Sequence, residues 1–158
     1  IRDKLVTGVQ TCALPICRFE DALAEVCRRE KVSLIPYSPI AGGVLSGKYQ
    51  DGAWPAGARF SLYKEHAERG AAMTRRFVNQ KSLESTRRLS AIAADAGMSP
   101  VTLAVAWSLA HDFVGSTIIG ATRPEQLGDI LRAAEVKLSA DVLAACDGVT
   151  REILYPMG

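Results

Sequence analysis

A turn that begins with a glycine and contains an arginine is the most informative chemical feature of this sequence. The segment Gly120-Ala121-Thr122-Arg123-Pro124-Glu125 follows a short apolar run and precedes a helical pattern. The start of a helix presents free backbone N–H groups to an anion, and an arginine beside them can pair with a phosphate. Thr122 and Glu125 also have the spacing of a capping box, so a plain helix start with a solvated Arg123 explains the same residues equally well.

A second phosphate-binding pattern is incomplete. Residues 42–49, GGVLSGKY, nearly match the P-loop, in which glycines, a lysine and a small hydroxyl residue hold nucleotide phosphates. Tyr49 stands where Ser or Thr would hold magnesium, and residues 50–55, QDGAWP, do not predict the helix that should follow. The GxGxxG turn of a Rossmann domain is also missing. The sequence therefore argues against nucleotide hydrolysis and against a Rossmann fold.

Composition and charge exclude several further classes. The chain has 158 residues, 48% hydrophobic and 23% charged, with a net charge of +2, which is typical of one globular domain. The scattered Lys and Arg do not predict a nucleic-acid partner, and no apolar run approaches the length of a membrane span. His66 and His111 are isolated, which argues against a metal site. The helices on either side of Gly97 do not suit DNA recognition, because the second is apolar nearly all round.

The cysteines and the N-terminus bear on the compartment. The four cysteines have neither CxxC nor zinc spacing, so we expect reduced and mostly buried thiols at Cys12, Cys17, Cys27 and Cys146. The N-terminus lacks the basic-then-apolar plan of a signal peptide. Both observations favour the cytosol.

The elements that must position these residues alternate between helix and strand. Apolar spacing predicts a helix from Phe19 and a strand over Val32–Tyr37, followed by a long loop over residues 41–63. Another helix should end at Gly97, and Ser99-Pro100 should cap the next, which is apolar enough to be buried. A second strand is expected at Ser116–Ile119, with helices after Thr122 and after Ser139. This order predicts an α/β fold with parallel strands and helical crossovers.

The first residues read differently from the rest. Residues 6–16, VTGVQTCALPI, resemble the translation of a sequencing-library adapter and not a protein family. We therefore expect residues 1–17 to be non-native read-through and residues 18–158 to be the native domain, with residues 1–16 irregular and without a packed role. The alternative is an ordinary loop that contains a proline.

Two segments of the native part carry a family resemblance. Residues 37–49, YSPIAGGVLSGKY, closely resemble the seventh-strand signature of aldo/keto reductases. Residues 118–122, IIGAT, with Gln126-Leu127 resemble the eighth-strand signature. Residues 55–59, PAGAR, and the closing Tyr155-Pro156 resemble a bacterial subgroup with long loops, the Tas-like reductases.

The resemblance implies a fold and a cofactor. Its family fold is an eight-stranded (β/α)8 TIM barrel that binds NADP(H) without a Rossmann domain, so this chain would be a C-terminal piece with the last two strands. Tyr37 would stack on the nicotinamide. The pyrophosphate would lie along Ser38, Pro39, Ile40, Ala41 and Gly42, with Lys48 and Arg59 closing over it. The adenosine end with its extra phosphate would be held by Gly120, Ala121, Thr122 and Arg123, with Gln126 and Asp129 beside the adenine and ribose. Ile130 departs from the family, which usually has an adenine-contacting asparagine there.

The resemblance also implies an activity for the intact parent. It would transfer hydride from NADPH to a small-molecule aldehyde or ketone while a tyrosine protonates the oxygen. That tyrosine, with an aspartate, a lysine and a histidine, lies on the first four strands of the family fold, so the resemblance implies no catalytic residue here and an inactive fragment. The alternative is a non-catalytic cofactor-binding or regulatory barrel module. A helical interaction domain is less favoured, because two strands end in glycine-containing turns.

Overall fold

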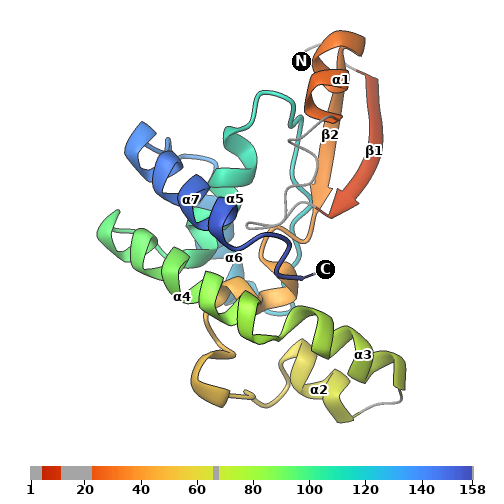
Figure 1. The fold of residues 1–158 in the computed structure, drawn as a ribbon, viewed down its shortest axis with the longest axis vertical. Coiled ribbons are helices and arrows are strands. Elements are labelled where there is room, and N and C mark those ends of the chain that lie inside the picture. The colour runs from red at the N-terminus through yellow and green to blue at the C-terminus, as the bar shows by residue number, and fades with distance from the viewer. Residues whose placement is uncertain (1–4, 12–22, 66–67, 158) are drawn as a thin grey trace.

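The chain folds into a mostly helical α/β structure, seen here in a computed structural model that describes residues 5–11, 23–65 and 68–157. Figure 1 shows the strands with α1 at one end and α2 with α3 at the opposite end. The elements in chain order are β1 (Leu5–Thr11), α1 (Leu23–Glu30), β2 (Val32–Tyr37), η2 (Ala41–Ser46), η3 (Gln50–Gly52), α2 (Arg59–Glu65), α3 (Glu68–Phe77), α4 (Gln80–Asp95), α5 (Pro100–Ala110), η4 (Pro124–Gln126), α6 (Leu127–Arg132) and α7 (Ala140–Glu152).

The expected strand at Val32–Tyr37 is confirmed as β2, and β2 has a parallel neighbour on each side. On one side β1 pairs with it, from Leu5 opposite Val32 to Thr11 opposite Tyr37. On the other side, single bridges join Leu34 to Val114 and Tyr37 to Ile118.

The expectation that residues 1–16 are irregular is wrong for β1. Val6, Thr7, Val9 and Thr11 are β-branched, and such residues favour strands whatever the origin of the segment. The edge of β2 offers unpaired N–H and C=O groups to a strand of that kind. The read-through origin of residues 1–17 stays a prediction, and residues 12–17 lie outside the described part of the chain.

Within the expected strand at Ser116–Ile119, only Ile118 forms a bridge to β2; the other bridge lies before it, at Val114. Between these bridges β2 advances three residues, from 34 to 37, whereas the opposite segment advances four, from 114 to 118. The extra residue interrupts the ladder, as in a β-bulge. Pro36 contributes a carbonyl, which accepts from the Ile118 N–H at 2.8 Å, but it has no N–H to return.

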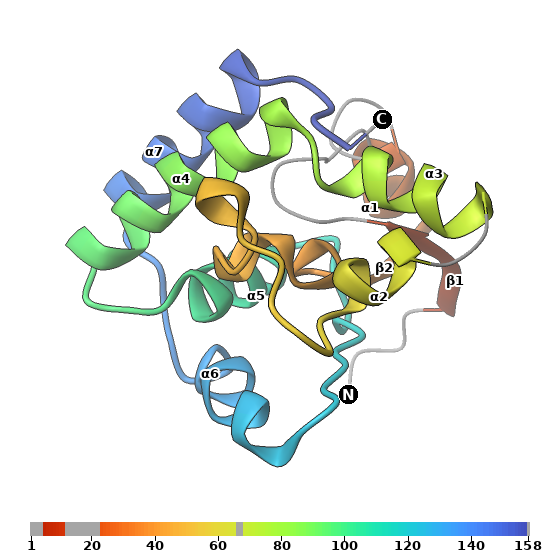
Figure 2. The same cartoon turned by 90° about the horizontal axis from the view of Figure 1, so that it is seen from below.

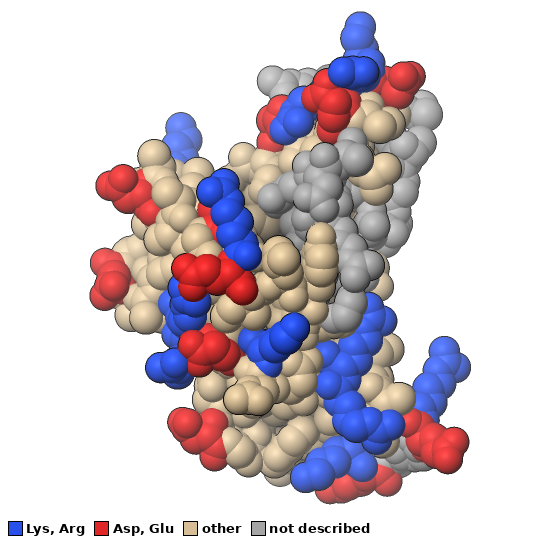
Figure 3. Space-filling model, in the orientation of Figure 1, with Lys and Arg blue, Asp and Glu red and all other residues tan. Residues whose placement is uncertain are grey.

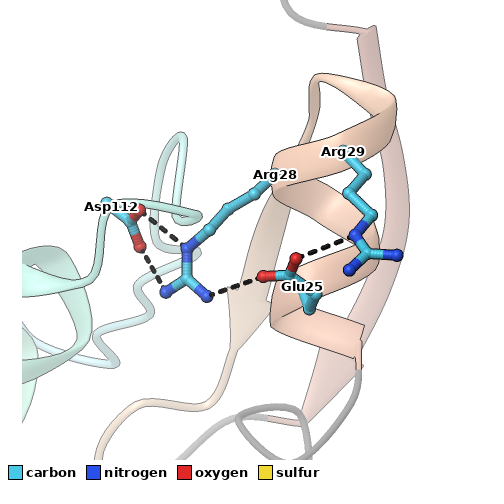
Figure 4. A network of polar contacts seen from close by, with 4 residues as sticks. All are labelled: Glu25, Arg28, Arg29 and Asp112. Atoms are coloured by element: carbon cyan, nitrogen blue, oxygen red, sulfur yellow. Dashed lines mark hydrogen bonds and ion pairs between the residues drawn. The ribbon is translucent and has the colours of Figure 1, made fainter.

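An ion-pair network connects α1 with the segment that bridges to β2 at Val114 and Ile118. Arg28 forms two hydrogen bonds of 2.9 Å with Asp112, one from Nε and one from Nη2 (Figure 4). Glu25 lies 3.8 Å from Arg28 and 2.8 Å from Arg29. The carboxylate of Asp112 raises the pKa of Arg28. Asp112 precedes the segment that bridges to β2, so the network connects α1 with that segment.

The main hydrophobic core lies between the helices and the segment that follows β2. Its buried residues from that segment include Val44, Leu45 and Tyr49. They pack with Leu89 of α4, Trp107 of α5 and other residues of α5 and α7. Figure 2 shows α4 and α7 lying side by side, as they also do in Figure 1. The expected long loop at residues 41–63 is therefore packed into the core and contains η2, η3 and the start of α2.

Several helix boundaries follow from capping residues that the sequence identifies. Ser99 caps α5, as expected, by accepting from the Thr102 N–H, and Ser139 caps α7, the helix expected after it, by accepting from the Val142 N–H. The apolar α5 is buried from Thr102 to Ser108, as its composition predicts. Gly97 adopts a positive φ of 67° just beyond α4, which ends that helix.

Two of the four cysteines lie in the described part of the chain. Cys27 and Cys146 are both buried, as expected. Burial, with a smaller effect from the charge of Asp147, raises the pKa of the Cys146 thiol to about 11. Cys12 and Cys17 lie outside the described residues.

Candidate functional site

The carboxyl ends of β2 and of its bridged neighbour lie side by side. Tyr37, the last residue of β2, is paired with Ile118. Its side chain is 42% exposed, although it ends a strand whose other positions are mostly buried. The Tyr37 ring is therefore accessible at the edge where both segments end.

The backbone after Tyr37 turns sharply in an unusual conformation. Ser38 and Ala41 have φ values of 59° and 52°, a left-handed region that non-glycine residues rarely adopt. The Ser38 hydroxyl accepts from the Gly42 N–H at 3.0 Å, and the Ser38 carbonyl accepts from Ala41 N–H at 2.8 Å. Such strained residues concentrate at binding sites, where the surrounding structure holds them.

The cores on either side fix this turn from within. Ala41 is fully buried, Pro39 is buried, and Ile40 packs against two of the hydrophobic clusters. These side chains pack in the interior, on the side of the turn that faces away from solvent. A ligand would therefore meet the backbone of this segment and the exposed ring of Tyr37.

Two cationic side chains fold back over the glycines of the turn. A Cβ on Gly43 would lie 2.6 Å from Lys48 Nζ, and a Cβ on Gly42 would lie 3.5 Å from Arg59 Nη1. A side chain at either glycine would occupy the space that these cations use. Both glycines also have positive φ, 65° at Gly42 and 98° at Gly43.

A third cation approaches from the turn after Ile119. Arg123 Nη2 lies 3.8 Å from the position of a Cβ on Gly57, in the loop before α2. Burial lowers the pKa of Lys48, and the charges of Arg59 and Arg123 lower it further. None of the ion pairs found among the described residues neutralises any of these three cations. We call Lys48, Arg59 and Arg123 the cation cluster.

Basic residues on another part of the surface are arranged differently. Figure 3 shows Lys and Arg side chains gathered over the end of the molecule formed by α2 and α3, with acidic side chains among them. The α3 sequence supplies Arg69, Arg75 and Arg76 there, next to Glu68. Mixed charges of this kind are typical of a solvated helix face.

The turn from Gly120 to Gln126 differs from the capping box that the sequence predicts. Gln126 Oε1, and not Glu125, accepts from the Thr122 N–H at 2.8 Å. Arg123 occupies the N-cap position of η4 and makes no side-chain capping bond. Pro124 at the first position removes one of the N–H groups that a cap would satisfy. The Arg123 guanidinium, which has no acceptor atom for a cap, reaches toward Gly57.

The remaining predicted site residues lie on the same exposed segment. Gly120, Ala121, Thr122, Gln126 and Asp129 are all exposed. The Asp129 carbonyl accepts from Thr102 Oγ1 at 2.8 Å, which ties α6 to α5 and leaves the carboxylate exposed. Ile130 is buried against α5, so this position does not present a side chain to a ligand.

The sequence did not identify Tyr49, Phe60, Gly43 and Gly57 as site-forming residues. The glycine–lysine spacing in residues 42–49 was a usable signal, because it brings Lys48 back over Gly43. The contacts of Tyr49 and Phe60 depend on tertiary packing and have no such signal.

The described part of the chain has a groove elsewhere, but it lacks what a metal site or a single membrane-spanning helix would need. A groove of about 1090 Å³ runs between η3, the start of α4 and the end of α7, and its lining contains no predicted site residue. Among the described residues, no group of three or more His, Cys, Asp or Glu could hold a metal ion. Among the described helices none alone could cross a bilayer, and the one pair that passes by length and composition is bent by 91°.

Comparison with known proteins identifies the family. The family model of the aldo/keto reductases matches residues 8–151. "Protein tas" of Escherichia coli is 36% identical over 138 residues, which cover 87% of this chain and 38% of that protein. The "Putative voltage-gated potassium channel subunit beta" of Schizosaccharomyces pombe is 35% identical over 115 residues, 72% of this chain and 32% of that protein.

An enzyme relative has a similar degree of likeness. L-glyceraldehyde 3-phosphate reductase of Escherichia coli is 32% identical over 114 residues, 72% of this chain and 32% of that protein. The chain thus spans about 38% of the length of the Tas relative and about 32% of the other two. Since the family match covers most of the described segments, including both ends of the site, the chain belongs to the aldo/keto reductase family of oxidoreductases.

Proposed function

We propose that this chain forms the phosphate-binding part of the NADP(H) site of an aldo/keto reductase that reduces aldehydes or ketones. The observation that carries the proposal is the cation cluster, in which Lys48, Arg59 and Arg123 converge beside a strained glycine turn. Holding like charges together is unfavourable unless an anion binds there, and the described residues supply no carboxylate that pairs with them. A dinucleotide with a pyrophosphate and a 2′-phosphate supplies such charges.

The residues divide the cofactor between them. The exposed ring of Tyr37 would stack on the nicotinamide, and the Ser38–Gly42 backbone would follow the pyrophosphate beneath Lys48 and Arg59. The segment from Gly120 to Arg123 would hold the adenosine phosphate, with Gln126 and Asp129 nearby. When bound, NADPH supplies the hydride for carbonyl reduction.

We place the catalytic residues outside this chain, on the earlier strands of a TIM barrel whose last two strands would be β2 and the segment 114–118. The coverage of the relatives supports this division, because the matched residues span 38% of the length of the Tas relative. The resemblance assigns protonation of the carbonyl oxygen to those residues and to none in the proposed site. The chain by itself is then expected to bind cofactor without reducing any aldehyde.

The experiment compares NADPH with NADH, which lacks the 2′-phosphate. Residues 18–158 are joined to the N-terminal part of the Tas relative, and both affinities are measured by calorimetry. Replacing Arg123 with alanine should weaken NADPH binding by about 1.5–3 kcal/mol, as for a lost charge-assisted hydrogen bond, and NADH binding far less. The exposed Arg132→Ala in α6 is the matched control. Equal losses for both cofactors would assign Arg123 to the solvated surface.

A second candidate is a non-catalytic module that senses the cofactor. It is favoured by the relative whose printed name refers to a potassium channel subunit. The coding sequence upstream of this chain separates the two candidates: the family's aspartate, tyrosine, lysine and histidine encoded there would support the reductase, and their replacement would support the module.

A further inference from the structure

Tyr49 connects the segments that carry Lys48 and Arg59, two of the three residues of the cation cluster. It occupies the position at which the P-loop-like segment departs from a P-loop, and it is only 1% exposed. Its ring packs against Trp54 and Phe60, with centroids 5.8 Å away in each case. Its hydroxyl accepts from the Phe60 N–H at 3.1 Å.

That hydrogen bond satisfies a group at the start of α2. The first N–H groups of a helix have no partner within the helix, and Phe60 is the second residue of α2. Ala58, which precedes α2, has a methyl side chain and cannot cap it. The Tyr49 phenol thus serves as a cap from eleven residues away.

The same contact sets the position of two cations. Lys48 precedes Tyr49 directly, and its Nζ lies 5.5 Å from the centre of the Tyr49 ring. Arg59 precedes Phe60 directly, and the Phe60 ring approaches within 2.9 Å of a Cβ placed on Gly42. Lys48 and Arg59 repel each other, so a buried connection between their neighbours is needed to keep them together.

We propose that Tyr49 is a positioning residue that holds Lys48 and Arg59 ready for a phosphate, through the hydrogen bond from the Phe60 N–H to its hydroxyl. This inference rests on the proposed function. Rigid cations lose less conformational freedom on binding than mobile ones, so the connection should strengthen binding of the phosphates without touching them.

The test uses Tyr49→Phe in the 158-residue chain, which keeps the buried ring and removes only the acceptor oxygen. NADPH affinity, measured by calorimetry, should fall by about three- to tenfold, because the loosened Lys48 and Arg59 lose more conformational freedom on binding. Hydrogen exchange at the Phe60 amide should become faster. Tyr63→Phe is the matched control, because Tyr63 also packs on Phe60 but is 40% exposed. Its affinity should stay at the wild-type value.

A double-mutant cycle separates positioning from general packing. If Tyr49 acts through Arg59, the variant Tyr49→Phe/Arg59→Gln should bind NADPH about as weakly as Arg59→Gln alone. Additive losses, an equal loss in Tyr63→Phe, or unchanged affinity in Tyr49→Phe would each overturn the inference and leave the proposed function standing. Absence of NADPH binding by the wild-type chain would overturn the proposed function, and this inference with it.

Discussion

Lys48 shows how a binding residue can act against the stability of its own fold. Its ammonium group is partly removed from water and faces two guanidinium groups, and all three effects lower its pKa from the ordinary value of 10.5. The protonated form is therefore less favourable in the folded chain than in the unfolded chain. A bound phosphate would reverse this by supplying the missing negative charge.

The replacement Lys48→Met should therefore stabilise the chain at neutral pH and weaken NADPH binding. The unfolded wild-type chain holds more protons than the folded one between the lowered folded-state pKa of Lys48 and 10.5. Stability should rise with pH across that interval for the wild type relative to Lys48→Met. Urea unfolding at several pH values measures the difference, with the exposed Lys137→Met as control. A constant difference between wild type and Lys48→Met at all pH values would contradict the prediction.

At the level of elements, α4 owes its start to one side chain that also anchors the C-terminal tail. Asn79 Oδ1 accepts from the Ser82 N–H at 3.1 Å, and Ser82 Oγ accepts from the Asn79 N–H at 3.1 Å, which completes a capping box. Asn79 Nδ2 also donates to the Pro156 carbonyl at 2.7 Å. Arg76 Nε donates to the next carbonyl, that of Met157, at 2.7 Å. The tail is thus tied to the junction of α3 and α4.

Asn79→Ala should cost more stability than Ser139→Ala, which removes a cap alone. Loss of a cap costs about 1 kcal/mol. Loss of the tail contact adds about 1 kcal/mol for an unmade hydrogen bond. Urea unfolding monitored by tryptophan fluorescence compares the two variants, and limited proteolysis reports release of the tail. Equal losses, with the tail still protected, would show that the contact to Pro156 contributes nothing.

The elements also show how far sequence patterns reach. Ser99, Ser139 and Gly97 act locally, through bonds within one helix turn, and their roles were predictable from the sequence. The capping box at Thr122 and Glu125 was a wrong prediction, because Gln126 competes for the same N–H group. The apolar pattern at 116–119 did not reveal the extra residue that breaks its ladder with β2.

The site was predictable in part for the same reason. The contacts within residues 37–48 could be predicted from the motif, because the turn that brings their backbone and side chains together is local. The approach of Arg123 to Gly57 and the hydrogen bond between Tyr49 and Phe60 depend on packing of distant segments. The adapter-like origin of residues 6–16 predicted no strand there, but strand pairing depends only on the residues present. The β-branched residues of β1 favour a strand, and β1 pairs with β2.

At the scale of the whole molecule, the described strands leave two open edges. The sheet consists of β1 and β2, and in the described part of the chain nothing pairs with the outer side of β1 or of the segment 114–118. A TIM barrel removes its edges by closing about eight strands on each other. Here Ile118 and Ile119 are 44% and 39% exposed at the bridged segment. Open edges with apolar side chains favour pairing with another copy.

The chain should therefore associate as its concentration rises, and Ile119→Lys should reduce this association. A lysine on an exposed edge opposes strand pairing because its charge would have to lose water in the paired state. Size-exclusion chromatography with light scattering, across a tenfold range of concentration, measures the effect. Leu131→Lys is the matched control, since Leu131 is 58% exposed but lies on α6, away from the strands. If the edge drives association, Ile119→Lys shifts the onset to higher concentration and Leu131→Lys does not. A chain that stays monomeric at all concentrations, or equal effects of the two lysines, would show that the open strands are not what brings copies together.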